Sequence, residues 1–333
     1  MDDIRRFFDL TAALNMRAKL RRVLPLVDLM TAGSTALAGG YFYIIKRLGL
    51  SEMPLSKRAL EKIGIWPIRR HYYEPYFDPG MLRHPLDEPR DLPGLDLHTA
   101  ESLGLIPELA EFAGEELTKS DPAAPSYHHD NGNYGLPDAV LLHAMVRHFK
   151  PRRIVEIGSG NSTLVVNAAL GRNRDEDRPC EHLCIEPYEM PWLEAAGCTV
   201  LRKMVEDVDP AIFAELEAGD ILFVDNSHMI RPQGDVLTVV QRILPRLKPG
   251  VIIHIHDLFT PRDYPQSWLL RDRTMWNEQY LVEAFLTMNP LFRVLFAANH
   301  IYVDHRDQFD RLRPELAGRE WHTPTAMWVR RTG

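Results

Sequence analysis

The stretch that decides the fold is RRIVEIGSGNSTL, residues 152–164. The apolar run 153–157 is typical of a buried strand, and the polar residues that follow the turn begin a predicted helix at 161–170. Gly158 and Gly160 permit a tight turn and let a ligand approach the backbone, while the helix N-terminus offers free N–H groups. The stretch therefore predicts a strand, a ligand-binding turn and a helix, in that order.

Further apolar runs alternate with helical patterns along the remaining chain. The strands are predicted at 153–157, 182–186, 199–202, 220–225, 251–257, 292–297 and 326–331. The helices are predicted at 136–149, 161–170, 191–197, 209–217, 233–247 and 276–288. Continuous apolar strands separated by crossover helices predict an α/β doubly wound sheet. Because no long helix separates the last two strands, we expect them to form an antiparallel pair at one edge.

The composition is that of an ordinary globular protein. The 333 residues are 45% hydrophobic and 26% charged, and the net charge of −7 argues against nucleic acid as the main partner. The cysteines are Cys180, Cys184 and Cys198, an odd number without the C-x-x-C spacing of zinc sites. We therefore expect buried or incidental thiols in a reducing compartment.

Residues 1–125 predict an irregular, proline-rich extension. No signal-peptide pattern is present, so a cytoplasmic location is expected. The apolar stretch 23–45 is long enough to span a bilayer, but Pro25, Asp28 and the Gly39-Gly40 pair interrupt it. A packed or interfacial helix is favoured, with peripheral membrane contact through residues 17–47. The extension is a candidate region for substrate, oligomer or membrane contacts, and homo-oligomerisation stays open.

Two ligands fit the turn, a dinucleotide pyrophosphate or the amino-acid end of S-adenosylmethionine. Thr163 replaces the third glycine of dinucleotide folds, and Glu156 would repel a pyrophosphate but attract an ammonium group. Glu186 ends the second strand, where an acidic side chain accepts hydrogen bonds from ribose hydroxyls in either ligand family. After the third strand, Glu206 or Asp207 can reach an adenine amino group, although carboxylates of a solvated loop are the more frequent explanation. The turn therefore favours S-adenosylmethionine.

Four motifs resemble the successive motifs of class I S-adenosylmethionine-dependent methyltransferases. They are VEIGSGNST, CIEPYE, DILFVDNSH and VIIHIHD. More narrowly, they resemble a bacterial O-methyltransferase-like branch with a VDxSH fourth motif and an HD fifth motif. The resemblance covers roughly residues 126–333 and implies a Rossmann-like seven-stranded sheet of order 3-2-1-4-5-7-6 with strand 7 antiparallel. The chain departs from the pattern by an insertion at 304–324, either a lid or a surface excursion.

The cofactor contacts expected from these motifs come from the turn, from the ends of strands two to four, and from the loop before the first strand. They are Tyr134, Glu156, Gly158, Ser159, Gly160, Asn161, Ser162, Glu186, Pro187, Glu206 and Asp225.

The candidate acceptor site is formed by two acids. Asp225 ends strand four and Asp257 ends strand five, and these strands are neighbours in the expected sheet. Adjacent carboxylates repel unless a cation lies between them, so Mg²⁺ or another divalent ion would suit this position. Related metal-dependent O-methyltransferases hold an ion with acids at these strand ends, and His228 and Asn226 are nearby further ligands. The alternative is a pair of hydrogen-bonded aspartates without a metal.

Histidines supply the candidate base. His254 and His256 alternate along strand five and so point to one face, and His256 lies nearer the ligand-binding edge. A neighbouring carboxylate can orient an imidazole and raise its basicity, so His256 is the first candidate for general base and His228 the second. Each is equally consistent with an ordinary hydrogen-bonded histidine. A candidate substrate loop follows strand five, with Arg262, Asp263, Tyr264 and Trp268.

The sequence therefore predicts a methyltransferase that methylates an oxygen of a hydroxylated small molecule or a glycan. The predicted division is a 1–125 extension and a 126–333 methyltransferase domain. Two other functions are compatible with the pattern, an NAD(P)-dependent oxidoreductase and a non-catalytic protein that keeps the methyltransferase fold.

Overall fold

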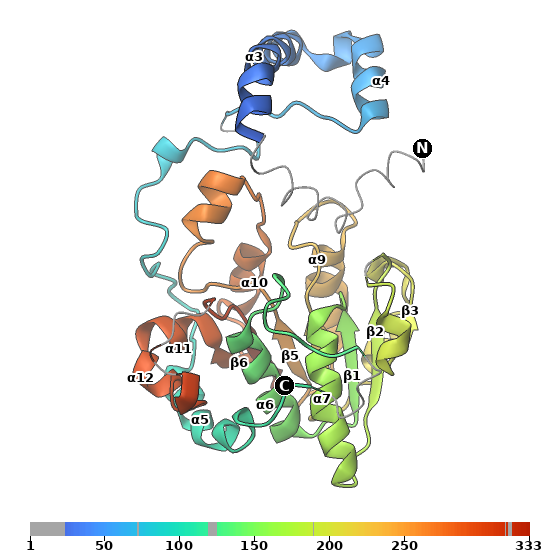
Figure 1. The fold of residues 1–333 in the computed structure, drawn as a ribbon, viewed down its shortest axis with the longest axis vertical. Helices are drawn as coiled ribbons and strands as arrows, with labels where there is room; N and C mark the ends of the chain where they lie inside the picture. The colour runs from blue at the N-terminus through green and yellow to red at the C-terminus, as the bar shows by residue number, and fades with distance from the viewer. Residues whose placement is uncertain (1–23, 72, 119–124, 189, 317, 319–321) are drawn as a thin grey trace. The chain divides into compact units, whose positions relative to one another are not determined.

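The computed structural model describes residues 24–71, 73–118, 125–188, 190–316, 318 and 322–333 (Figure 1). By contacts, the chain divides into two compact units, Met1–Leu82 and Arg83–Gly333. The part of the predicted membrane-contact segment before residue 24 lies outside the described residues.

The described residues of the first unit form two helices, α3 (Leu24–Leu48) and α4 (Pro54–Ile63), and the short turns η1 (Leu50–Glu52) and η2 (Pro79–Met81). Its small core consists of Ile45, Leu50 and Leu60. The predicted 23–45 helix is thus present as α3, and many of its large apolar side chains are exposed. Among the helices that the structure describes, none is both long and apolar enough to cross a membrane.

The second unit is built on a seven-stranded sheet of order β3-β2-β1-β4-β5-β7-β6. The strands are β1 (Arg153–Ile157), β2 (Glu181–Ile185), β3 (Thr199–Leu201), β4 (Ile221–Val224), β5 (Ile252–Ile255), β6 (Phe292–Ala297) and β7 (Met327–Arg331). Strands β1 to β5 pair in parallel, and β7 lies antiparallel to both β5 and β6. The predicted fold class, strand order and antiparallel strand are confirmed.

Helices cover both faces of this sheet (Figure 1). One face packs against α5 (Thr99–Ala113), α6 (Leu136–Phe149), α7 (Asn161–Asp175), α11 (Ala298–Asp304) and α12 (Arg306–Phe309). The other packs against α8 (Ala211–Ala214), η5 (Val239–Ile243) and α10 (Glu278–Leu286), and α9 (Asp235–Thr238) directly precedes η5. Alternate strand residues enter opposite cores, Ile154 the first and Val155 the second, because successive side chains of a strand point to opposite faces.

The remaining short turns are η3 (Leu193–Ala196), η4 (Val205–Asp207), η6 (Leu244–Arg246), η7 (Ser267–Asp272) and η8 (Pro314–Leu316). The helix predicted at 233–247 is therefore divided into α9, η5 and η6. Pro245 in η6 lacks the N–H that a continuing helix needs. The insertion at 304–324 is packed in part, since Phe309 and Leu312 are buried in the first core.

The first core also includes a segment from the predicted extension. Ile106, Leu109 and Ala113 of α5 are buried in it together with residues of α6. The compact unit around the sheet begins at Arg83. The division into a 1–125 extension and a 126–333 domain stays a prediction. The functions assigned to residues 1–125 stay predictions.

Candidate active site

The glycine turn after β1 lies against the end of β4. Gly158 has a φ of 78°, and its N–H donates to the carbonyl of Ile185 at 3.0 Å. A Cβ at Gly158 would lie 1.7 Å from the backbone oxygen of Asp225. The position therefore requires glycine both for its left-handed backbone and for space. The predicted donor-binding turn is consequently in direct contact with the first predicted acceptor acid.

The end of β2 is held to the same turn. Glu186 accepts hydrogen bonds from the N–H of Ser159 at 3.3 Å and from the N–H of Tyr188 at 2.8 Å. Gly160 precedes α7, whose first residues are Asn161 and Ser162. Glu186, with Pro187 directly after it, thus lies beside the turn, as the predicted cofactor-binding set requires.

Besides Glu156 Oε1, three polar atoms of the predicted cofactor-binding set are buried without a hydrogen-bond partner within the described part of the chain. They are Tyr134 Oη, Ser159 Oγ and Glu206 Oε2. Buried polar atoms are normally satisfied, so unpaired ones are atoms to which a bound ligand can supply the missing partner. The residues present therefore fit a polar cofactor at this edge of the sheet.

Glu156 occupies a different environment from the one expected. Its side chain is fully buried on the sheet face covered by α7, and Oε2 accepts a hydrogen bond from Thr163 Oγ1 at 2.6 Å. The predicted contact between Glu156 and the ammonium group of a ligand is not supported by this position.

Asp225 and Asp257, the acids after β4 and β5, both lie next to His228. His228 Nε2 lies 3.3 Å from Asp225 Oδ1 and 3.5 Å from Asp257 Oδ2. Oxygen and nitrogen atoms of the three residues all lie within 4.8 Å of one another. Both His228 and Asp257 have a φ of 57°, an uncommon backbone conformation that the neighbouring structure must hold in place. The structure therefore brings three of the predicted catalytic residues together.

Residues of the loop before α10 and of α10 itself orient His228. Its Nδ1 lies 2.9 Å from Glu278 Oε2, and the Trp276 ring packs against it with a centroid distance of 4.3 Å. Asn226 Nδ2 donates to the other Glu278 oxygen at 3.1 Å. A carboxylate behind Nδ1 leaves Nε2 facing the two aspartates, the arrangement typical of metal-ligating histidines.

His256 lies on the other side of the two aspartates. Its Nδ1 is 3.7 Å from Asp225 Oδ1 and 3.5 Å from Asp257 Oδ1. The Tyr134 ring stacks on it at a centroid distance of 4.8 Å. His256 thus links the residue predicted to contact the methyl donor with the acids of the predicted acceptor site.

Thr325 fixes the tautomer of His256. Thr325 Oγ1 donates to Asp257 Oδ1 at 3.1 Å and lies 3.2 Å from His256 Nε2. Because the hydroxyl proton is used toward Asp257, the threonine oxygen accepts from the Nε2–H of His256. Nδ1 of the neutral ring then carries the lone pair, and it has no hydrogen-bond partner among the described residues.

Asp138 holds Thr325 in position. This buried carboxylate at the start of α6 accepts from the N–H groups of Thr325 at 3.0 Å and of Ala326 at 3.1 Å. Since β7 is antiparallel, its first residues lie at the same edge as the last residues of β4 and β5. This orientation brings Thr325 next to Asp257.

The charges of the cluster shift the pKa values of its members. Burial lowers the pKa of His228, but Asp225 and Glu278 outweigh it and raise the pKa to about 10. Burial is likewise outweighed at His256, where Asp257 and Asp225 raise the pKa well above the usual value. For Asp225, burial opposes ionisation, yet His256 and His228 lower the pKa. Asp225 and the two imidazoles thus stabilise one another in their charged forms while no cation is bound.

The donor set fits a divalent cation. Four carboxyl groups, from Asp138, Asp225, Asp257 and Glu278, surround the imidazoles of His228 and His256. Acidic groups outnumber basic ones in this cluster. The ligand atoms that lie within 4.8 Å of one another are two carboxylate oxygens and one imidazole nitrogen. Hard oxygen donors with one imidazole suit ions such as Mg²⁺ or Mn²⁺. His228 supplies the third ligand that the sequence left open.

His254 is a core histidine. As predicted, it shares a face with His256, and the two ring centroids are 6.0 Å apart. Its ring is fully buried between Phe223 and Trp328. Burial is the largest cause that lowers its pKa well below the usual value, so the ring is neutral.

Most side chains of the predicted substrate loop are bound to other residues of this chain. Arg262 forms a bidentate ion pair with Asp304 and donates to a backbone carbonyl through Nε. Asp263 accepts from Tyr280 at 2.9 Å, and Tyr264 is almost fully buried. Trp268 packs edge-on against Trp276, which in turn contacts His228. Among these residues, Trp268 therefore has the most direct connection to the acidic cluster.

Sequence reasoning did not identify Asp138, Thr325, Trp276 and Glu278. Asp138 and Glu278 lie in the first turns of predicted helices, where acids are common for reasons of helix stability alone. Trp276 has the pattern of a core helix residue. For Thr325, the one sequence signal is the expected antiparallel direction of β7. This direction puts the residues just before β7 at the ligand-binding edge of the sheet.

Part of the chain is similar to a known protein family. Residues 155–258 match the model of a protein family described as "Methyltransferase domain". A curated relative from Archaeoglobus fulgidus, described as an uncharacterized protein, is 31% identical over 137 residues. This similarity covers 37% of the present chain and 59% of the relative, so the chain spans less than two thirds of that relative's length.

Solved methyltransferase structures are also similar to this chain. The O-methyltransferase from Bacillus cereus in complex with SAH is 12% identical with a TM-score of 0.35, over 69% of this chain and 90% of that chain. CalS11, a TDP-rhamnose 3'-O-methyltransferase of calicheamicin biosynthesis, is 15% identical with a TM-score of 0.37, over 69% of this chain and 93% of that chain.

Proposed function

We propose that this chain, whose residues 155–258 carry a methyltransferase domain, transfers a methyl group from S-adenosylmethionine to an oxygen of a hydroxylated small molecule or a glycan. The observation that carries the proposal is the contact between the Gly158 turn and the backbone of Asp225. This closeness of the glycine turn to Asp225 supports a donor and an acceptor that bind side by side. Methyl transfer requires that proximity, because the acceptor oxygen must lie in line behind the methyl group.

The donor is held by the turn and by the ends of β2 and β3. The N-terminus of α7 offers backbone N–H groups, and Tyr134, Ser159 and Glu206 each supply a buried polar atom that needs a partner. Glu186 lies beside Ser159, at the position expected to accept from ribose hydroxyls. These residues orient the donor and exclude water from it.

Asp225, Asp257 and His228 are proposed to hold a divalent cation next to the acceptor oxygen. When bound, such a cation lowers the pKa of a coordinated hydroxyl and so favours the nucleophilic alkoxide. Glu278 orients His228 for this role through Nδ1. The alternative, an acceptor site without a metal, leaves Asp225 and Asp257 paired with the two histidines and Asp257 hydrogen-bonded to Thr325.

His256 is proposed as the general base, accepting the acceptor proton at Nδ1, in the state in which a cation bound by Asp225 and Asp257 offsets their charge and so favours the neutral ring. Thr325 holds the proton of the ring at Nε2, so that Nδ1 is the free nitrogen and faces the two aspartates. His228 is less suited, because Glu278 occupies its Nδ1 and Nε2 faces the proposed cation position. Membrane contact through residues 17–47 and homo-oligomerisation stay predictions.

An acceptor screen tests the proposal. The purified chain is incubated with methyl-labelled S-adenosylmethionine, Mg²⁺ and a panel of catechols, phenols and sugars, and label in the acceptor is counted. With an acceptor found, Asp257→Asn should reduce transfer by on the order of a hundredfold while S-adenosylhomocysteine binding is kept. Unchanged transfer in Asp257→Asn would remove that residue from the mechanism.

Chelation distinguishes an acceptor site that uses a metal ion from one that does not. Thorough EDTA treatment should abolish transfer, and Mg²⁺ or Mn²⁺ should restore it. Transfer that survives EDTA, with no effect of added Mg²⁺, would leave His256 acting without a metal.

A further inference from the structure

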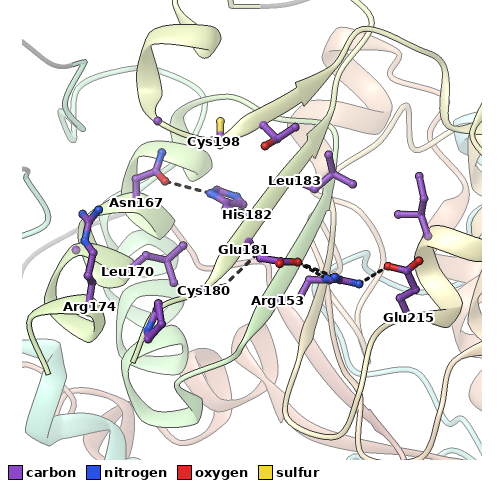
Figure 2. Close-up of a pocket in the computed structure, with 15 residues that line it drawn as sticks. Arg153, Asn167, Leu170, Arg174, Cys180, Glu181, His182, Leu183, Cys198 and Glu215 are labelled. Carbon is purple, nitrogen blue, oxygen red and sulfur yellow. Dashed lines mark hydrogen bonds and ion pairs between the residues drawn. The ribbon is translucent and has the colours of Figure 1, made fainter. Parts of the chain in front are cut away.

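A cavity of about 960 Å³ lies at the other end of the parallel strands, beside the amino ends of β1, β2 and β3 (Figure 2). Its wall includes Asn167 of α7, His182 of β2 and Cys198 just before β3. Cys180 and Arg153 line the same cavity. The proposed methyl-transfer mechanism uses none of these residues.

Two of these wall residues, His182 and Cys198, gather with the buried Cys184 behind the wall. His182 Nε2, Cys184 Sγ and Cys198 Sγ all lie within 4.8 Å of one another. Cys184 is fully buried, and its sulfur lies 3.6 Å from His182 Nε2. Thiolate and imidazole donors at such separations are typical of sites for Zn²⁺ and related thiophilic ions.

His182 is oriented to present a lone pair to this cluster. Asn167 Nδ2 donates to the Ala196 carbonyl at 3.1 Å, which fixes Asn167 Oδ1 as the acceptor for His182 Nδ1, also at 3.1 Å (Figure 2). The proton of the neutral ring is therefore on Nδ1, and Nε2 faces the sulfurs. A second group that holds the far nitrogen is characteristic of histidines that bind metals.

The fourth donor is Glu156, the acid that the glycine turn does not use. Its Oε1 is buried, has no hydrogen-bond partner among the described residues, and lies 3.4 Å from His182 Nε2. Its Oε2 is bound by Thr163 and lies 3.4 Å from Cys184 Sγ. A fully buried carboxylate with one unsatisfied oxygen is costly unless a cation or a proton compensates it.

We propose that His182, Cys184 and Cys198, whose ligand atoms all lie within 4.8 Å of one another, bind one Zn²⁺ ion, and that the carboxylate of Glu156, which lies beside His182 and Cys184, joins them as the fourth ligand when the ion binds. Binding converts two thiols to thiolates and releases their two protons to solvent, and it gives the unpaired oxygen of Glu156 a cationic partner. The cavity that His182 and Cys198 line provides the entry path for the ion. The cysteines lack a C-x-x-C spacing because two neighbouring strands, rather than one loop, supply them.

The site ties three strands together. Glu156 is in β1, His182 and Cys184 are in β2, and Cys198 immediately precedes β3. Zn²⁺ should therefore raise the melting temperature of the chain, because an ion that binds only the folded state shifts the folding equilibrium toward it.

Cobalt substitution tests the proposal. The full chain without an affinity tag is stripped with a chelator and titrated with Co²⁺, and its absorption spectrum is recorded. We expect one equivalent to produce a thiolate-to-cobalt charge-transfer band together with the intense visible bands of four-coordinate Co²⁺. Zn²⁺ should displace the Co²⁺ and remove both. The Asp225, His228 and Asp257 cluster contains no sulfur, so Co²⁺ bound there would not give the charge-transfer band.

Matched variants assign the ligands. Cys198→Ser should weaken Co²⁺ binding by on the order of tenfold or more, with loss of charge-transfer intensity, and Glu156→Gln should also weaken it. Cys180→Ser is the control, because Cys180 lines the same cavity but its sulfur donates to a backbone carbonyl. Asp225→Asn should leave the band unchanged.

Two results would overturn the proposal. One is a wild-type chain without a charge-transfer band, which would mean that protonated His182 simply pairs with Glu156. The other is a band that Cys198→Ser leaves intact. If circular dichroism shows that Cys198→Ser is unfolded, the presence or absence of the charge-transfer band in the wild-type chain still tests the proposal.

Discussion

At the residue scale, Gly158 is the residue of the proposed site with the least space for a side chain. The turn after β1 passes so near the end of β4 that no side chain fits between them. The same contact sets the separation between the donor-binding turn and Asp225. A single added methyl group there should consequently disturb both folding and ligand binding.

Gly158→Ala is therefore expected to destabilise the chain by on the order of 3 kcal/mol or more, because it combines a steric overlap with a positive φ. Binding of S-adenosylhomocysteine should be lost even where the variant folds. Gly171→Ala in α7 is the control, since a Cβ there meets nothing within 4 Å. The control should be neutral or more stable by about 1 kcal/mol, as measured by urea unfolding. Equal stability of the two variants would refute the steric argument.

Thr325 is the positioning residue with the clearest test. Thr325→Val removes the hydroxyl that keeps the proton of His256 on Nε2, while the shape of the side chain is conserved. We expect kcat for methyl transfer to fall by roughly tenfold, with KM for the donor unchanged, and Thr325→Ser to restore activity. A merely structural role would instead lower the melting temperature of Thr325→Val without changing kcat in the folded protein.

Residues at strand ends could be predicted from the sequence, and their supporting residues could not. Asp225, Asp257, His228 and His256 follow from the order of β4 and β5 alone. Glu156 shares its strand with residues that face the core, and the sequence does not show whether a carboxylate there meets a ligand or a buried histidine. The predicted ammonium contact was thus not supported because the face of β1, rather than its end, determines what Glu156 touches.

At the element scale, an ion-pair cluster joins α6 to its neighbours. Arg147 of α6 is buried and pairs with Glu115, just past α5, and with Glu176, just past α7. His143, one turn earlier on α6, contacts Glu115 at 2.8 Å. Because α6 and α7 cover the sheet beside the donor-binding turn, this cluster supports the site indirectly.

The cluster predicts acid sensitivity. Burial raises the pKa of Glu115, but hydrogen bonds from Arg147 and His143 outweigh it and lower the pKa below its ordinary value. A carboxylate with a lowered folded-state pKa stabilises the fold above its unfolded pKa of about 4.3, and the contribution is lost as the pH falls through the folded value. Glu115→Gln should cost about 1–3 kcal/mol at pH 7 and flatten this acid-side dependence.

Urea unfolding between neutral and acidic pH measures this effect. Glu111→Gln, on the exposed side of α5, is the matched control and should change stability little. Parallel pH profiles for wild type and Glu115→Gln would show that the cluster does not contribute.

The predicted elements agree with the structure where apolar runs are continuous. All seven strands occur at or within two residues of the predicted bounds, because buried parallel strands have an unambiguous sequence pattern. The helix predicted at 233–247 is divided, because amphipathic periodicity does not show where a π turn or Pro245 ends an α-helix. The sequence pattern of the insertion at 304–324 did not predict that Phe309 would be buried in the first core.

At the scale of the whole molecule, the chain divides into two compact units with separate cores. A chain that begins at Arg83 should fold cooperatively and bind S-adenosylhomocysteine, because it keeps α5 and both cores of the sheet. A chain that begins at Ser126 loses Ile106, Leu109 and Ala113 from the first core and should be much less stable. Thermal unfolding by circular dichroism compares the two, and equal melting temperatures would contradict the boundary at residues 82 and 83.

The account depends most on which nucleotide binds at the ends of β1 and β2. Isothermal titration of the purified full chain with S-adenosylhomocysteine and, separately, with NADH measures this directly. The account predicts saturable binding of one S-adenosylhomocysteine per chain and no binding of NADH. Tight binding of NADH without binding of S-adenosylhomocysteine would contradict it.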